Sequence, residues 1–317
     1  LWRWLNLVWW NPLDSLRADM LVIIRQAIHG FLRGRDPYAV YQVPWDAPLA
    51  YGPVLWGPYV IPSMLGVELR YVTLIGEMFV PACCALAALV EARRRQALGA
   101  AAWLLLLTAI VFNPDLWNFT SIGHTPSYWP WLPLFALLVV AEQWSAAACV
   151  LGLLVVGRTT MVSIVPVFVM ALWLHARSRM ARAIGIMLAT IAALLVPFLV
   201  WDPQALWYGM VAVYSPVIKT VIWTTPDIVR TIGVTGWLIS HQLHRFVEVT
   251  QVAVMAGGYM LAWRALRRGA ALLPWCVITL LAFSLTTLWP VYYIYFDVLW
   301  LLVSAAFAVT LGRVPPR

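Results

Sequence analysis

Long apolar runs, interrupted by short clusters of arginine, constrain this chain more than any other feature. Hydrophobic residues make up 63% of the 317 residues and charged residues only 11%, and the mean hydropathy is +0.83. Soluble domains carry about 25% charged residues. A soluble fold cannot bury so much apolar surface, whereas a bilayer accommodates it in helices of about 20 residues. The composition therefore predicts an all-α polytopic membrane protein.

The formal net charge of +8 comes from basic residues that lie in clusters between the apolar runs. Such clusters are typical of the cytoplasmic loops of membrane proteins. They do not form the basic face with interleaved polar residues that a nucleic-acid-binding surface needs. We therefore expect the lipid bilayer, and no nucleic acid, as a partner. The clusters are Arg93 to Arg95; Arg177, Arg179 and Arg182; Arg264, Arg267 and Arg268; and Arg313 with Arg317.

If all four clusters face the cytoplasm, the number of crossings between successive clusters is even and the C-terminus is cytoplasmic. The apolar runs satisfy this condition with about nine crossings. Several runs are shorter than the about 20 residues of a full span, as half-helices that line a cavity are. The predicted crossings are residues 71–91, 97–112, 130–141, 145–157, 160–174, 183–200, 249–263, 271–288 and 296–311.

Because no linker or internal repeat divides the chain, we expect a single membrane domain over residues 1–317. It begins with an outer-face loop, residues 1–70, and continues with a transmembrane core, residues 71–200. A mostly outer segment, residues 201–248, precedes the C-terminal transmembrane helices, residues 249–317.

The outer loop itself is predicted to hold interfacial helices. Leu21, Ile24 and Ile28 recur at helical spacing, which predicts an amphipathic surface helix from Leu16 to Leu32. A second surface helix, interrupted by prolines, is expected over residues 52–66.

Asp19 is the first candidate for chemistry, since it lies at the start of the predicted surface helix. A carboxylate at the membrane edge can act as a general base that takes a proton from an attacking hydroxyl. The alternative is an acidic residue that complements the helix dipole. Asp14, five positions earlier in the chain, is the nearest rival for the catalytic role.

Several motifs resemble those of membrane glycosyltransferases of the GT-C type. The run from Asp19 to Tyr38, with Gly34, Pro37 and Tyr38 at its end, resembles their first outer loop, particularly in glycosyltransferase family 87 and its relatives. Further similarity, in the same order as in the family, lies in Tyr51-Gly-Pro53-Val-Leu55, in Gly152 to Arg158 followed by Pro166, and in the aromatic turn Trp289-Pro-Val-Tyr-Tyr-Ile-Tyr295. The family's Pro-Pro pair is Gly52-Pro53 here.

The resemblance implies a GT-C-like helical bundle that transfers a mannose- or pentose-like sugar. The donor would be a polyprenyl-phosphate sugar and the acceptor a glycan or glycolipid on the outer face of the bacterial cytoplasmic membrane. Asp19 would be the catalytic base, and no metal or other cofactor is expected. The family's first transmembrane helix precedes this aspartate, so a segment upstream of Leu1 is also expected.

Cationic side chains on the outer side are candidates for binding the phosphate of the donor. Arg158 ends an apolar run, where a guanidinium either holds a phosphate bidentately or reaches out to lipid headgroups. The other candidates share the outer segment, and each is alternatively a solvated loop charge; they are Lys219, Arg230, His241 and Arg245. His241 and His244 have a spacing that zinc ligands use, but no third ligand accompanies them.

Polar and aromatic residues of the outer face are candidates for binding the sugar or acceptor. His124 lies in a Gly-His-Thr-Pro loop, and Asp297 lies just past the late aromatic turn. Like Glu77, Asp297 is an acid within an apolar run, which favours a functional role. Aromatic rings either stack on sugar faces or belong to the interfacial belt; they are Tyr292, Tyr293, Tyr295, Trp117, Trp129 and Trp289.

Two other functions compete with glycosyl transfer. A multi-pass transporter or flippase would place polar residues in mid-membrane and repeat half of its fold. An O-antigen-type polymerase or ligase would use a long outer loop carrying Arg and His, which residues 201–248 resemble. The early loop from Asp19 to Tyr38 favours the glycosyltransferase.

Overall fold

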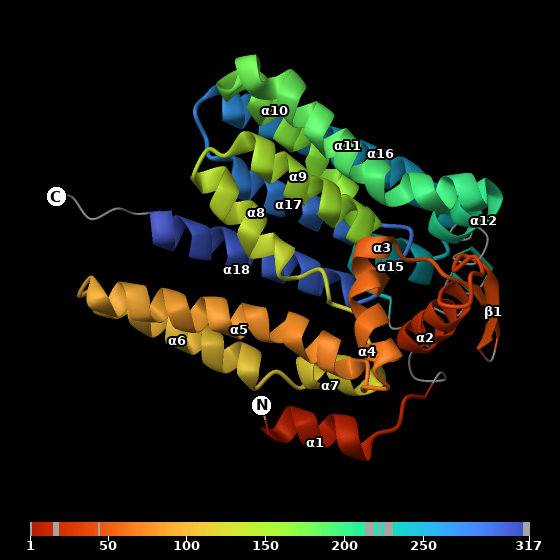
Figure 1. The fold of residues 1–317 in the computed structure, drawn as a ribbon. Helices are drawn as coiled ribbons and strands as arrows, with labels where there is room; N and C mark the ends of the chain where they lie inside the picture. The colour runs from red at the N-terminus through yellow and green to blue at the C-terminus, as the bar shows by residue number, and fades with distance from the viewer. Residues whose placement is uncertain are drawn as a thin grey trace.

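The computed structural model describes residues 2–14, 19–43, 45–212, 219–220, 223–224 and 231–312. Helices dominate this part of the chain (Figure 1). Each predicted crossing coincides with a helix, because each apolar run is long enough for several turns whose backbone groups bond to one another. The helices are α5 (Arg70–Arg93), α6 (Ala97–Val111), α8 (Trp131–Val140), α9 (Trp144–Gly157), α10 (Val165–His175), α11 (Arg177–Trp201), α16 (Val247–Arg267), α17 (Leu272–Thr286) and α18 (Ile294–Gly312).

Among the described residues, four helices are long and apolar enough to cross a membrane. They are α5, α11, α18, and α16 together with the short helix η5 (His244–Phe246) that precedes it. A fifth span is possible by length if α6 and α7 (Pro114–Ile122), which are bent by 49°, form one broken segment. Asn113 caps the start of α7, since its side chain accepts a hydrogen bond from the Asp115 amide. The structure is therefore that of a helical membrane protein.

Burial separates the inner helices from those that face lipid. In α5 and α18 the most apolar stretch is 56% and 67% buried inside the protein, whereas in α11 and α16 it is only 17% buried. Helix α18 packs against α5, α8 and α17, and α9 packs against α11 (Figure 1). Apolar side chains that are fully buried, including Leu132, Phe135, Leu151 and Leu301, fill the space between these helices.

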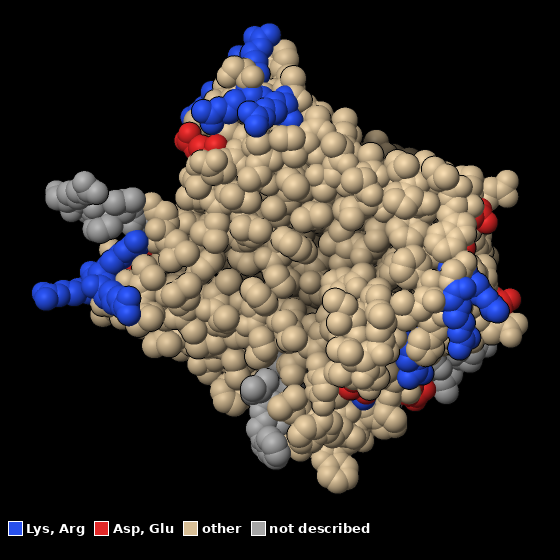
Figure 2. All heavy atoms as spheres, viewed as in Figure 1, with Lys and Arg blue, Asp and Glu red and all other residues tan. Residues whose placement is uncertain are grey.

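The described arginine clusters lie together at one end of the molecule. The turns from α5 to α6, from α10 to α11 and from α16 to α17 lie at the same end as the last turn of α18 (Figure 1). Figure 2 shows blue basic atoms at the top and left of this end, further blue and red atoms at the opposite end, and almost no charge over the middle of this face. This arrangement agrees with the even number of crossings that the sequence requires. Arg313 and Arg317 lie outside the described residues.

The outer loop lies at the opposite end (Figure 1). The predicted helix from Leu16 to Leu32 is α2 and begins only at Met20; residues 15–18 lie outside the described part. Its expected position on the membrane surface is wrong, because Leu21, Ile24 and Ile28 are fully buried in the protein core. The helix packs against other parts of the outer loop, so its apolar face is covered by protein.

The remainder of the outer loop combines short helices with a hairpin. The interrupted helix expected over residues 52–66 is confirmed as a series of short helices. A two-stranded antiparallel hairpin, which the sequence did not predict, pairs Val40 with Pro48. These elements are α1 (Trp2–Trp10), β1 (Val40–Val43), β2 (Trp45–Pro48), α3 (Pro53–Trp56), η1 (Gly57–Tyr59) and α4 (Val60–Met64).

Gly52 joins the outer loop to the end of α9. A Cβ atom at this position would lie 1.8 Å from the Val156 carbonyl oxygen, so only glycine allows this approach. The contact brings α3 against α9 just before Arg158.

The described part of the segment after α11 lies at the same end of the molecule as α2 (Figure 1). Its described part comprises α12 (Pro203–Trp207), the π-helical turn η3 (Tyr208–Ala212) and α15 (Gly233–Ser240), followed by η5. Asp202 starts α12 because its carboxylate accepts hydrogen bonds from the Gln204 and Ala205 amides.

Candidate functional site

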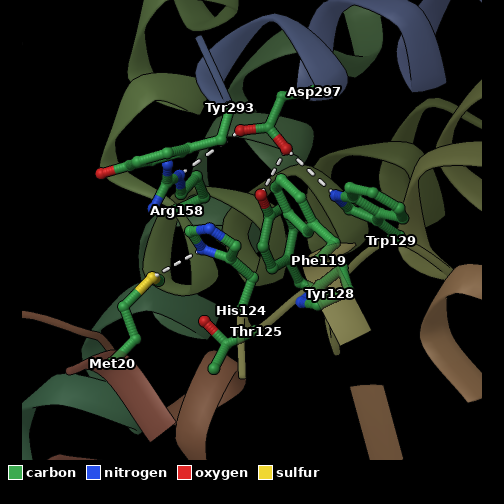
Figure 3. A pocket seen from close by; sticks show the side chains of 10 residues that line it. Met20, Phe119, His124, Thr125, Tyr128, Trp129, Arg158, Tyr293 and Asp297 are labelled. Atoms are coloured by element: carbon green, nitrogen blue, oxygen red, sulfur yellow. Dashed lines mark hydrogen bonds and ion pairs between the residues drawn. The ribbon is translucent and has the colours of Figure 1, made fainter. Parts of the chain in front are cut away.

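Side chains from four separate parts of the chain enclose a small cavity (Figure 3). Its volume is about 20 Å³, which is room for about one water molecule. Met20 comes from the start of α2, and Arg158 directly follows α9. Figure 3 labels most of the lining, which is Met20, Phe119, His124, Thr125, Pro126, Tyr128, Trp129, Arg158, Tyr293 and Asp297.

An ion pair between Arg158 and Asp297 is the main electrostatic feature of the cavity. Arg158 Nε lies 3.4 Å from Asp297 Oδ2, and the side chains are only 15% and 3% exposed. Tyr128 Oη and Trp129 Nε1 both donate hydrogen bonds to Asp297 Oδ1, the latter over 3.1 Å. Charges buried this deeply need such partners, because the loss of water is costly.

Tyr128 is neutral, and its hydroxyl donates a hydrogen bond that holds the Asp297 carboxylate in place. Burial raises the pKa of the Tyr128 phenol well above its ordinary value of 10.0, and the Asp297 carboxylate raises this pKa further. The phenol therefore stays protonated and donates a hydrogen bond to the Asp297 carboxylate. The α7–α8 loop supplies both Tyr128 and Trp129, so it fixes the orientation of the carboxylate opposite Arg158.

His124 forms one wall of the cavity in a neutral state. Its ring stacks on Phe119 with centroids 4.1 Å apart, and its Nδ1 lies 3.1 Å from the Met20 sulfur. Burial lowers the pKa of His124 from 6.5 to about 3, and the nearby Arg158 contributes to this shift. Thr73 Oγ1 donates to the His124 carbonyl over 2.9 Å, which anchors the loop to α5.

Tyr293 covers the cavity beside Arg158. The guanidinium carbon of Arg158 lies 5.7 Å from the centre of the Tyr293 ring, within range of a cation–π contact. Trp289 Nε1 donates to Tyr293 Oη over 2.6 Å. The predicted aromatic turn therefore does contribute a ring to the cavity.

Asp19 directly precedes the lining residue Met20 at the start of α2, but it is not itself among the lining residues. Its side chain makes no capping hydrogen bond to the helix, although its carbonyl accepts one from the Ile23 amide. Asp19 thus stands at the N-terminus of α2 without capping it by a hydrogen bond, and the alternative role, in which its charge complements the helix dipole, stays open.

The structure thus brings four predicted site residues together and leaves others elsewhere. His124, Arg158, Tyr293 and Asp297 all line the cavity. The remaining described candidates do not: the Lys219 ammonium pairs with Glu248 at 2.7 Å, His241 Nδ1 contacts the Trp237 carbonyl, Arg245 lies over the Phe246 ring, and Tyr292 packs against Tyr293. Arg230 lies outside the described residues.

Other candidates have structural partners. Glu77, buried in α5, accepts a hydrogen bond from Thr120. Asp36 accepts a hydrogen bond from the Tyr38 amide, which shapes the turn after α2. No group of three possible metal ligands occurs within the described ranges.

Sequence reasoning missed several residues of the cavity. Trp129, for which sugar stacking and a belt position were both open, is only 1% exposed and lines the cavity, so it does not lie in an interfacial belt. Met20, Phe119, Thr125 and Tyr128 were not singled out. One available signal was the density of polar residues from Thr120 to Tyr128, directly before an apolar run.

No protein-family model matches the chain, and neither does any curated protein or solved structure. The function must therefore be argued from the cavity itself and from the motifs in the sequence.

Proposed function

We propose that the protein is a membrane glycosyltransferase that moves a mannose- or pentose-like sugar from a polyprenyl-phosphate donor to a glycan or glycolipid acceptor. The chain would fold as a GT-C-like bundle with about nine crossings, the shorter helices serving as partial spans. The active site would face the outer side of a bacterial cytoplasmic membrane, with the C-terminus in the cytoplasm.

One observation carries this proposal. The residue after Asp19 and the guanidinium of Arg158 line the same cavity, although they lie far apart in the sequence. The reaction of a lipid-phosphate sugar needs a base and a phosphate-binding cation near one another, and the position of Met20 supports such a placement of Asp19. The start of α2, the end of α9 and the start of α18, which contribute residues to the cavity, lie away from the turns that carry the arginine clusters (Figure 1), on what would be the outer side under the positive-inside rule.

In the proposed reaction, the Asp19 carboxylate takes the proton of an acceptor hydroxyl. The acceptor oxygen then attacks the anomeric carbon of the donor sugar, and the bond from that carbon to the phosphate oxygen breaks. Arg158 would stabilise the phosphate that leaves, as guanidinium groups do for developing negative charge. A guanidinium carries five N–H donors, and its ion pair with Asp297, with Nε 3.4 Å from Oδ2, holds the group beside the cavity.

The size of the cavity adds a requirement. A volume of about 20 Å³ does not hold a sugar ring. Donor binding must therefore move the walls apart, as substrates do in enzymes whose loops close over them.

Transfer of a labelled sugar in membranes of the host organism tests the proposal. The donors would be polyprenyl-phosphate mannose and polyprenyl-phosphate arabinose, compared with membranes that lack the protein. We expect transfer from one donor that depends on the protein and is lost in Arg158→Met. Transfer from neither donor would contradict the proposal and favour a transporter.

A further inference from the structure

Thr125 presents a buried hydroxyl to the cavity. The side chain is only 3% exposed, and its Oγ1 atom is buried with no hydrogen-bond partner in the structure. In Figure 3 this oxygen points toward the side of the cavity that Met20 and His124 line. A buried hydroxyl without a partner destabilises a protein, so a ligand that supplies a partner removes that cost on binding.

Other buried threonines of the described chain differ from Thr125 in this respect. Thr73 bonds to Tyr59 and to the His124 carbonyl, Thr120 donates to Glu77, and Thr279 donates to the Trp275 carbonyl of its own helix. Thr160 Oγ1 and Ser163 Oγ are also buried without a hydrogen-bond partner, but of these three residues Thr125 alone lines the cavity.

The charges of the lining indicate what kind of ligand fits. Its one cation, Arg158, and its one anion, Asp297, are paired with each other, and His124 is neutral. Aromatic rings supply much of the remaining surface. If Arg158 binds the donor phosphate, an acidic group on the sugar would find no further cation in this lining. The flat aromatic rings suit the C–H faces of an uncharged sugar.

We infer that the Thr125 hydroxyl binds one hydroxyl of the transferred sugar, and that this sugar is uncharged. The inference rests on the proposed function and adds a residue that determines specificity. A site built to bond a substrate hydroxyl rejects the analogue that lacks it, because the buried protein group is then left unpaired.

The test compares Thr125→Val, which removes the hydroxyl at nearly constant shape, with Thr125→Ser, which keeps it. Thr279→Val is the matched control, since Thr279 is buried but its hydroxyl bonds within α17. Each variant is assayed with the transferred donor, either polyprenyl-phosphate mannose or arabinose, and with the set of forms of that donor that each lack one sugar hydroxyl.

We expect the wild-type protein to use one of these deoxy donors with a kcat/KM roughly ten- to a hundredfold lower than the parent donor. With the parent donor, the kcat/KM of Thr125→Val falls by a similar factor relative to wild type. With that deoxy donor, Thr125→Val and wild type have the same kcat/KM. Thr125→Ser keeps the preference, and Thr279→Val behaves as wild type.

Two results would overturn the inference while leaving the proposed function intact. They are an equal loss of kcat/KM for every donor in Thr125→Val, and no loss at all. If the wild-type protein transfers sugar from neither parent donor, the proposed function and this inference are both overturned. The wild-type assay gives that result before any variant is compared.

Discussion

The guanidinium of Arg158 and the carboxylate of Asp297 form a buried ion pair that joins the end of α9 to the first turn of α18, with Nε 3.4 Å from Oδ2. Removing one partner leaves the other charge buried and unpaired, which costs about 3–5 kcal/mol. We expect Arg158→Met to lower the thermal unfolding temperature in detergent, and the double variant Arg158→Met, Asp297→Asn to recover most of the loss, because Asn removes the unpaired charge and keeps the oxygen to which Tyr128 and Trp129 donate. The double variant should still transfer no sugar.

The exposed pair Lys219 and Glu248 provides the matched control for stability. Their side chains are 43% and 59% exposed, so water screens the attraction between them. Removing Lys219 alone should change the free energy of unfolding by less than about 1 kcal/mol. An equally large effect at both pairs would show that the cavity does not isolate Arg158 from water.

Gly52 gives a second prediction, about packing. Because its missing Cβ would lie 1.8 Å from the Val156 carbonyl oxygen, Gly52→Ala forces α3 away from α9. We expect a loss of about 1–3 kcal/mol in the free energy of unfolding. Gly57→Ala is the control, since a Cβ there meets no atom within 4 Å. If both substitutions are tolerated equally, the close approach of the outer loop to α9 is wrong.

Where the helices lie along the chain could be predicted from the sequence. Which candidate site residues lie together in space could not. Apolar runs fix where α5, α11 and α18 form, since any other backbone would leave polar groups unbonded in lipid. The surface position predicted for the Leu16–Leu32 helix failed because helical spacing shows which face is apolar but not whether lipid or protein covers it. Its start at Met20 depends on the local fold of the outer loop.

The cavity illustrates the same limit. Arg158 and Asp297 each stood out as a charge in an apolar run, which is the kind of signal that a single sequence carries. Their pairing, and the hydrogen bonds from Tyr128 and Trp129, depend on how distant segments pack. Trp129 looked like a belt residue because an aromatic ring beside an apolar run has the same pattern in both positions.

His124 predicts a dependence of stability on pH. Its pKa is about 3 in the folded protein, against 6.5 when the ring is exposed. Below about pH 6.5 the unfolded chain therefore binds a proton that the folded protein excludes. Stability should fall as the pH falls from about 6.5 toward 3, by up to about 1.4 kcal/mol per pH unit.

Unfolding of wild type and His124→Gln, measured by denaturant titration in detergent at pH 7 and pH 5, checks this prediction. The variant should lose less stability between the two pH values than the wild type does. His29→Gln, at an exposed histidine of α2, is the control and should retain the wild-type dependence. Identical pH profiles in all three proteins would rule out a neutral, buried His124.

The distribution of arginine predicts the orientation in the membrane. Single cysteines at Ala39, in the outer loop, and at Ser178, beside the second arginine cluster, both lie at exposed positions. In intact cells a membrane-impermeant thiol reagent should label Ala39→Cys but not Ser178→Cys, and both after lysis. The reverse pattern would contradict the proposed orientation. The background must lack the native cysteines, Cys83, Cys84, Cys149 and Cys276.

Asp19 tests the central claim most directly. Transfer of labelled sugar from the active polyprenyl-phosphate donor is measured for the wild type, Asp19→Asn and Asp46→Asn, with equal amounts of protein inserted in the membrane. Asp46, an exposed acid in β2, is the matched control. We predict that Asp19→Asn lowers the rate at least about a hundredfold, as loss of a general base does, while Asp46→Asn transfers as wild type. Transfer by Asp19→Asn at the wild-type rate would contradict the account.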